Sequence, residues 1–152
     1  ALYREFIAST TKLNTPGPKL ARLPGVHALT DVTGFGLLGH LVEVCKGAGV
    51  RATVRWDALP FLPETATLAK AGHVTGASGR NWSGYGTHVE LGAGLGDAEK
   101  ALLTDPQTSG GLLVACDPAA TPQVLAAFRE EGFGEAQVIG SIQGGTPRVT
   151  VS

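Results

Sequence analysis

The chain has 152 residues, the size of one domain, with 43% hydrophobic residues, a net charge of −1 and a pI of about 6.5. Lysine and arginine are scattered without a basic stripe, which argues against nucleic-acid binding. No apolar run approaches the roughly 18 residues of a membrane helix, and residues 1–12 lack a signal peptide's apolar core, so we expect a cytoplasmic protein without a membrane partner.

The first half of the chain is predicted to alternate helices with strands. Apolar residues spaced along residues 1–15 predict a helix, which the three prolines of TPGPKLARLPG end. The run VHALTDV predicts a buried strand, and an apolar stripe predicts a helix over residues 35–48. The alternation in VRATVRW predicts a half-buried strand, and residues 64–71 predict a short helix.

The second half begins with a long glycine-rich stretch, residues 75–96, which we interpret as a functional or disordered loop. DAEKALL predicts a short helix, and DPQTSGG predicts a turn that leads into the strand LLVAC. Residues 121–131 predict a helix with Thr121 as N-cap and Pro122 as its first residue. AQVIGSI and PRVTVS predict two closing strands joined by a hairpin-like turn. The expected fold is α+β, a mixed β-sheet flanked by helices.

The stretch TDVTGFGLLGH contains the G-x-G-x-x-G spacing of dinucleotide-binding turns. Gly34, Gly36 and Gly39 follow a predicted strand and open a predicted helix, and Asp57 follows the next strand, as that fingerprint requires. Asp31 stands three residues before the first glycine, where its charge would oppose a pyrophosphate unless a cation intervened. A nicotinamide dinucleotide (NAD) site is therefore the less favoured interpretation.

A metal–phosphate site accommodates both the carboxylate and the glycines. Mg²⁺ binds carboxylate oxygens and is commonly shared with substrate phosphates. Asp31 has the Thr30 and Thr33 hydroxyls beside it, and the start of the next helix offers backbone N–H groups to an anion. Asp31 could instead cap that helix, and the residues alone leave both interpretations open.

Two further segments carry candidate ligand contacts. Arg80 and Asn81 lie in the glycine-rich stretch, where they could meet phosphate or a partner domain, or simply belong to a solvated loop. Thr108, Ser109 and Gly110 lie in a turn that could present N–H groups to an anion or merely start a strand.

The two cysteines are predicted to be buried, inert thiols, and the histidines have no zinc-like spacing.

Three motifs in this order resemble those of one enzyme family: HALTDVTGFGLLGHL (27–41), TGASGRNWSGYG (75–86) and DPQTSGGLLVA (105–115). They closely resemble the C-terminal half of selenophosphate synthetases, also called selenide, water dikinases, and the match spans nearly the whole chain. This family belongs to the aminoimidazole ribonucleotide synthetase-like superfamily of ATP-using enzymes. The resemblance implies that superfamily's C-terminal domain, which is related to a ferredoxin-like arrangement.

The resemblance also implies a reaction and a metal ligand. The family makes selenophosphate from selenide, ATP and water, releasing AMP and phosphate, with Mg²⁺. One metal-binding aspartate comes from its C-terminal half, and Asp31 matches that position. A cation between Asp31 and the polyphosphate would reduce their repulsion, with the turns 33–36 and 108–111 as walls of the site.

The resemblance further implies a division of the chain and a missing partner. Residues 1–26 would be an interdomain helix and linker, and residues 27–152 the C-terminal synthetase domain. The reactive cysteine or selenocysteine and most metal ligands belong to an absent N-terminal domain, and neither Cys45 nor Cys116 matches that nucleophile. We therefore expect no catalytic residue here, an inactive fragment, and a homodimer at full length. A sister enzyme of the superfamily, acting on an amide or a thiamine phosphate, is the second alternative.

Overall fold

The structure is a computed structural model that describes residues 2–152. The chain forms two compact units, each built from separate segments of the sequence. The first unit comprises the chain up to Thr33 together with Gln107–Gln137, and the second comprises Gly34–Pro106 together with Val138–Ser152. Among the described residues, no helix has the length and apolar character needed to cross a membrane.

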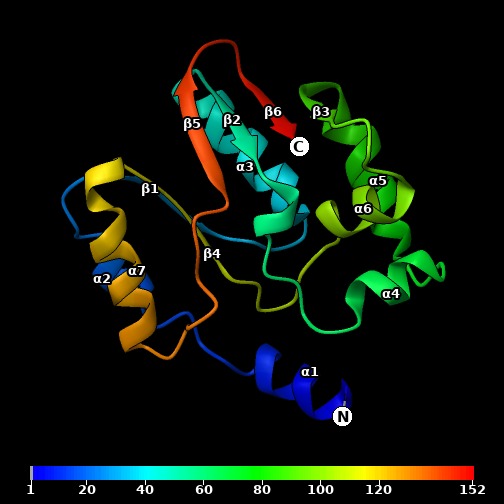
Figure 1. Ribbon diagram of the computed structural model, residues 1–152, viewed down its shortest axis with the longest axis horizontal. Coiled ribbons are helices and arrows are strands. Elements are labelled where there is room, and N and C mark those ends of the chain that lie inside the picture. The colour runs from blue at the N-terminus through cyan, green and yellow to red at the C-terminus, as the bar shows by residue number, and fades with distance from the viewer. Residues whose placement is uncertain (1) are drawn as a thin grey trace. The chain divides into compact units, whose positions relative to one another are not determined.

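The first unit is a two-stranded antiparallel sheet with helices packed against it (Figure 1). Its buried cluster comes from α2 and α7: Leu20 of the former packs with Val124, Ala127 and Phe128 of the latter. Partly buried residues of both strands, such as Leu29 and Val114, complete this core. Its elements are α1 (Leu2–Thr10), α2 (Gly17–Leu20), β1 (Val26–Asp31), β4 (Leu112–Cys116), η3 (Pro118–Ala120) and α7 (Thr121–Glu130).

The second unit contains a four-stranded mixed sheet in the order β3-β6-β2-β5, covered by the longest helix, α3 (Figure 1). The strands β3, β6 and β2 are parallel, and β5 is antiparallel to β2 at the edge. Its elements are α3 (Gly36–Ala48), β2 (Val50–Val54), η1 (Trp56–Ala58), α4 (Thr65–Lys70), α5 (Gly76–Tyr85), η2 (Gly86–His88), β3 (Val89–Leu91), α6 (Asp97–Leu103), β5 (Gly140–Gly144) and β6 (Arg148–Val151).

Local patterns correctly predicted the α3–β2 segment. Leu38, Leu41, Val42 and Cys45 form the buried face of α3, which packs against β2 and β6. The helix ends at Gly49, whose left-handed backbone lets its N–H donate to the carbonyl of Cys45. The alternation along β2 also matches its burial, since Ala52 and Val54 are buried while Arg51 and Thr53 are exposed. The strand β4 and the helices α4 and α6 form close to their predicted positions as well.

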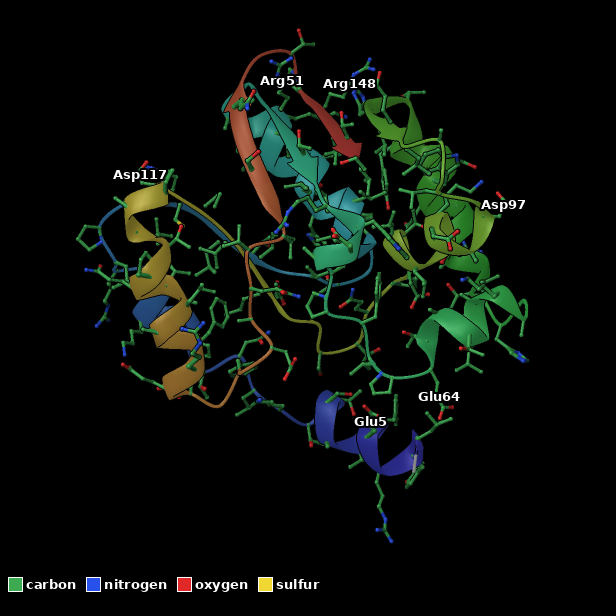
Figure 2. The ribbon with its side chains drawn as sticks, in the orientation of Figure 1. Glu5, Arg51, Glu64, Asp97, Asp117 and Arg148 are labelled. Carbon is green, nitrogen blue, oxygen red and sulfur yellow. The ribbon has the colours of Figure 1, made fainter. Side chains whose placement is uncertain are left out.

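Charge repulsion arises where the strands β2 and β6 run side by side. Arg51 and Arg148 are register partners at the start of the parallel pairing and lie at the same end of the sheet (Figure 2). Glu90 of the neighbouring strand β3 forms an ion pair with Arg148. This carboxylate reduces the repulsion between the two guanidinium groups.

The prediction of a loop over residues 75–96 is wrong, because this stretch forms α5, η2 and β3. Thr75 caps α5 by accepting a hydrogen bond from the Ser78 N–H at 3.3 Å. Tyr85, at the other end of α5, donates to the carbonyl of Phe35 at 2.6 Å. The local cap and the contact of Tyr85 with a distant segment stabilise a helix that its glycines disfavour intrinsically.

The predicted hairpin-like pairing of the last two strands is also wrong. β5 and β6 lie on opposite sides of β2 and do not pair with each other, and β5 begins at Gly140, later than expected. The expected mixed sheet is present in the second unit, but β1 and β4 form a separate sheet. The first two residues of the predicted turn QGG belong to β5, and residues 145–147 connect this antiparallel neighbour of β2 to its parallel neighbour β6.

Three smaller predictions at helix ends and cysteines need correction. Of the helix predicted over residues 1–15, the described part forms α1 over Leu2–Thr10 only, and the proline-containing stretch includes the short helix α2. Thr121 is the first residue of α7, not its N-cap, which is Ala120 without a side-chain cap. Cys45 is buried as predicted, whereas Cys116 is partly exposed and lies 3.8 Å from the Thr121 hydroxyl.

Substitutions at two glycines of β5 can test how closely this strand approaches β2. A Cβ at Gly140 would lie 2.0 Å from the Thr53 carbonyl oxygen, whereas a Cβ at Gly144 meets nothing within 4 Å. We expect Gly140→Ala to lower the free energy of unfolding by about 1–3 kcal/mol, because the strand must shift to relieve the overlap. The matched variant Gly144→Ala should stay within about 0.5 kcal/mol. Urea titrations measure both, and equal losses would contradict the close approach.

Candidate functional site

Asp31 is the last residue of β1 and has an exposed side chain. Its backbone is paired with Leu112 of β4, so the strand fixes the position of its Cα. Its carboxylate joins none of the ion pairs formed by the described residues. The alternative role of Asp31 as a helix cap is wrong, because α3 begins five residues later, after Phe35. A carboxylate fixed at a strand end and open to solvent can coordinate an ion.

The turn after Pro106 lies directly beside Asp31 in the first unit. The Val32 N–H donates to the Gly111 carbonyl at 2.9 Å, and the Gln107 N–H donates to the Thr33 carbonyl at 3.0 Å. These bonds continue the β1–β4 ladder past the ends of both strands. The pairing therefore brings Asp31 and Thr33 together with Thr108–Gly110, although 74 or more residues separate the segments in the sequence.

This turn is tightly held and contains an unusual backbone conformation. A Cβ at Gly110 would lie 2.0 Å from the Val32 carbonyl oxygen, so only glycine permits this approach. The Asn14 amide donates to the Gly110 carbonyl at 2.9 Å, a contact that the sequence patterns did not indicate. Thr108 and Ser109 are exposed, and Ser109 has a φ of 53°. Left-handed conformations of this kind are uncommon outside glycine and often occur at functional sites.

The glycines of GFGLLG serve mainly the packing of the second unit. A Cβ at Gly36, whose φ is 68°, would lie 2.7 Å from the Thr104 carbonyl carbon. A Cβ at Gly39 would lie 2.5 Å from the Phe35 Cβ and 2.8 Å from the Tyr85 ring. Gly34 alone of the three meets nothing within 4 Å. The spacing of Gly36 and Gly39 therefore reflects contacts with the protein itself.

The NAD interpretation fails on topology. A dinucleotide-binding βαβ unit places its two strands in parallel in one sheet, with the helix between them in sequence. Here β1 pairs with β4 in one sheet, while β2 belongs to the other. The segment β1–α3–β2 therefore has the order of that unit without its geometry. The predicted role of Asp57 as a ribose ligand is lost with it.

Asn81 and Tyr85, one turn apart on α5, hold the glycine-containing turn before α3. The Asn81 amide donates to the carbonyls of Gly34 and Thr104, both at 2.9 Å, and so uses both of its N–H groups. Burial raises the pKa of Tyr85 to about 12, so its hydroxyl stays protonated and donates to Phe35 at neutral pH. The four-residue spacing of Asn81 and Tyr85 places them on one face of a helix. The sequence could not indicate this, because it did not predict a helix here.

Arg80 differs from its neighbour Asn81. Its side chain is exposed on α5 and belongs to none of the ion pairs among residues 2–152. A guanidinium group open to solvent retains its donors for a phosphate or carboxylate. Arg80 is thus available as an anion contact, whereas the amide of Asn81 is occupied by the fold.

The described residues contain no group of three or more histidine, cysteine, aspartate or glutamate side chains that could hold a metal ion. Asp31 and the nearby threonine and serine hydroxyls nevertheless present oxygen atoms, which hard cations prefer. This donor set fits a contribution of one carboxylate to an Mg²⁺ site. It does not suffice for a complete site.

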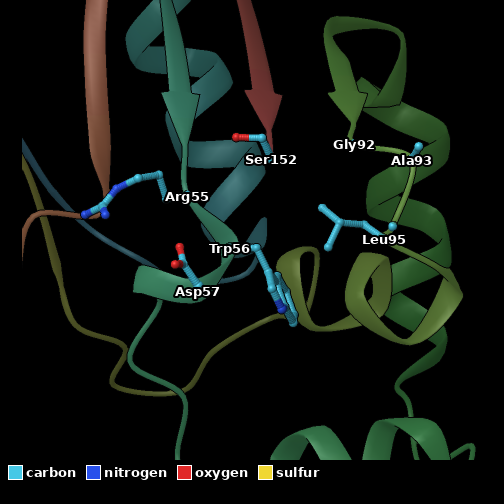
Figure 3. A pocket seen from close by; sticks show the side chains of 8 residues that line it. Arg55, Trp56, Asp57, Gly92, Ala93, Leu95 and Ser152 are labelled. Atoms are coloured by element: carbon cyan, nitrogen blue, oxygen red, sulfur yellow. The ribbon is translucent and has the colours of Figure 1, made fainter.

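An open pocket of about 570 Å³ lies elsewhere in the second unit, after the carboxyl ends of the three parallel strands (Figure 3). Arg55–Asp57 follow β2, Ser152 follows β6, and Gly92–Leu95 follow β3. The Leu95 side chain points toward the Trp56 indole, so the wall between them is apolar. Asp57, the acidic residue of the rejected dinucleotide fingerprint, lines this pocket, whereas Asp31 and the other residues predicted for the metal–phosphate site do not.

A protein-family comparison matches residues 8–152 to the AIR synthase related protein, C-terminal domain. Curated relatives named selenide, water dikinase are 61% identical in Burkholderia pseudomallei and 58% in Pseudomonas straminea, covering 99% and 98% of this chain and 42% of each relative. A relative of the same name from Rhizobium meliloti is 48% identical over 98% of this chain and 43% of its own length. The chain thus spans about 42% of the length of these relatives.

Solved structures with a similar fold include the hydrogenase maturation protein HypE from E. coli. It has a TM-score of 0.62 and 22% identity, over 88% of this chain and 34% of HypE. A HypE crystallised in complex with ATP has a TM-score of 0.58 and 20% identity, over 91% of this chain and 36% of that one. At such identities the similarity shows the fold alone. The predicted α+β fold and the resemblance of the three motifs are confirmed, and the chain belongs to the AIR synthase related family as a C-terminal domain of that family.

Proposed function

We propose that this chain is the C-terminal part of a selenide, water dikinase, which makes selenophosphate from selenide, ATP and water and releases AMP and phosphate. The observation that carries the proposal is 61% identity to a curated protein of that name over 99% of this chain. The relatives reported above share the name, so the sister-enzyme alternative draws no support from them. The fragment is inactive alone, because the other 58% of the enzyme carries the remaining chemistry.

In the full-length enzyme, Asp31 contributes one carboxylate to an Mg²⁺ site that the N-terminal part completes. Mg²⁺ is usually held by one or two carboxylates together with substrate phosphates and water, so one aspartate is a plain share for this part of the enzyme to contribute. When bound, the ion lowers the repulsion between carboxylate and polyphosphate and stabilises charge during phosphoryl transfer. The exposure of Asp31 and its freedom from ion pairs within residues 2–152 support this role.

The other predicted residues divide into three groups. Thr33, Thr108 and Ser109 supply hydroxyls beside Asp31, while Gly110 supplies the close backbone approach that holds their turn. In the second unit, Gly34 has open space where a Cβ would be, and Arg80 has an exposed guanidinium in none of the ion pairs of residues 2–152, which suits phosphate contacts. Gly36 and Asn81 act through packing and positioning. A homodimer and a cytoplasmic location remain predictions.

The role of Asp31 is tested in the full-length enzyme with Asp31→Asn, which keeps the size of the side chain and removes its charge. A bound metal supplies several kcal/mol of charge stabilisation, so we expect selenide-dependent ATP hydrolysis to fall by about 100-fold. The Mg²⁺ concentration needed for half-maximal rate should rise as well. Asp57→Asn, also exposed but outside the proposed site, is the control. Unchanged hydrolysis in Asp31→Asn would reject the assignment.

The two roles on α5 are separated by substitutions at adjacent positions. Asn81→Asp leaves two carbonyls without donors and places a carboxylate against them, so we expect a loss of about 2–4 kcal/mol in the free energy of unfolding. Arg80→Gln should leave stability within about 0.5 kcal/mol and raise the KM for ATP in the full-length enzyme. Chemical denaturation measures the free energy of unfolding of both variants, and steady-state kinetics measures the KM for ATP. A stable Asn81→Asp protein would show that the amide does not hold the turn.

A further inference from the structure

The helix α1 carries an amphipathic face that the rest of the described chain leaves uncovered. None of its residues is buried. Tyr3 is 75% exposed and Phe6 55% exposed, with Leu2 and Ile7 also exposed. These four positions follow an i, i+1, i+4, i+5 pattern, which places their side chains on one side of a helix. The result is one continuous apolar strip, here called the α1 face.

The opposite side of α1 is polar and keeps the two surfaces distinct. Arg4 and Glu5 occupy it, the latter labelled in Figure 2. The helix has only nine residues. Isolated helices shorter than about 12–15 residues are marginal in water and obtain their stability from packing of an apolar face. A covered α1 face is therefore what this segment requires to remain a helix.

We propose that the α1 face docks against an apolar surface of the N-terminal part of the full-length polypeptide. The proposal rests on the proposed function in one respect, namely that this chain is part of a longer enzyme. The curated relatives extend well beyond it, since the chain covers only 42% of their length. A buried tyrosine usually hydrogen-bonds through its hydroxyl, so the docking surface contains a polar acceptor for Tyr3 within its apolar area.

The size of the α1 face favours a tethered partner over a second copy of the chain. At about 1.5 Å per residue, the helix is only about 14 Å long. Specific interfaces between separate molecules bury about 800 Å² on each side and involve roughly 20–30 residues. Four side chains fall far short of that, whereas a tethered surface is present at an effective concentration in the millimolar range.

The charge of α1 makes a membrane surface a less suitable partner for the α1 face than the N-terminal part. Interfacial helices carry several lysines or arginines on the polar face, which bind anionic lipids. Here the polar face has a single arginine next to a glutamate, and the chain as a whole has a net charge of −1. A surface of the same polypeptide requires no such cationic face.

Hydrogen–deuterium exchange tests the docking directly. The amides of residues 2–10 are compared between the full-length enzyme and the 152-residue chain. We expect exchange at least about 10-fold slower in the full-length enzyme, because the docked helix opens less often. Phe6→Ser should abolish most of this protection, while Arg4→Ser on the polar face should preserve it. Amides of α3 report whether each variant remains folded.

Three outcomes would overturn the proposal. The first is equal exchange of residues 2–10 in both proteins. The second is a dimeric 152-residue chain, seen by sedimentation, in which the same amides are protected. The third is protection that appears only on vesicles containing anionic phosphatidylserine. None of these measurements depends on catalysis, so the docking proposal and the assignment of Asp31 can fail separately.

Discussion

The antiparallel pairing of β1 with β4 is the interaction on which the candidate site depends. It fixes the end of β1, and its hydrogen bonds continue beyond the strands to the turn at Gln107–Gly111. Through this extension, Asp31 and the hydroxyls of Thr108 and Ser109 come from distant parts of the sequence into one region of the first unit. The small separation required at Gly110 makes the pairing sensitive to a single added carbon atom.

Glycine spacing shows where the backbone is approached closely but not what approaches it. In GFGLLG, two of the three glycines are required because Thr104, Phe35 and Tyr85 lie where a Cβ would be. The amide of Asn81 and the hydroxyl of Tyr85 then hold the carbonyls of the same turn. A motif that resembles a phosphate-binding turn thus serves mainly the close packing of the protein itself. Of its three glycines, only Gly34 has open space where a Cβ would be.

Two features of the chain each require a partner group that residues 2–152 do not supply. One carboxylate, Asp31, cannot hold a cation alone, and the short helix α1 has an apolar strip without a cover among residues 2–152. Both are explained if the remaining length of the relatives supplies metal ligands and a docking surface. The family membership and the proposed chemistry are therefore compatible without a catalytic residue in this part.

The sequence by itself determined the elements whose pattern is local. The apolar stripe of α3, the alternation of β2 and the short helix α6 depend on neighbours a few residues away, so periodicity predicted them. It also singled out Asp31, because a charge beside glycines conflicts with a bare phosphate. The three motifs identified the family, which the match of residues 8–152 to the family model confirms.

Only the tertiary structure decided the features that depend on distant contacts. The stretch 75–96 becomes helical because Thr75, Asn81 and Tyr85 find partners elsewhere in the second unit. The choice of β2 as neighbour of both β5 and β6, and the separation of the strands into two sheets, depend on pairing between remote segments. Local propensity contains no information on such pairing, because its free energy comes from groups that meet only after the chain has folded.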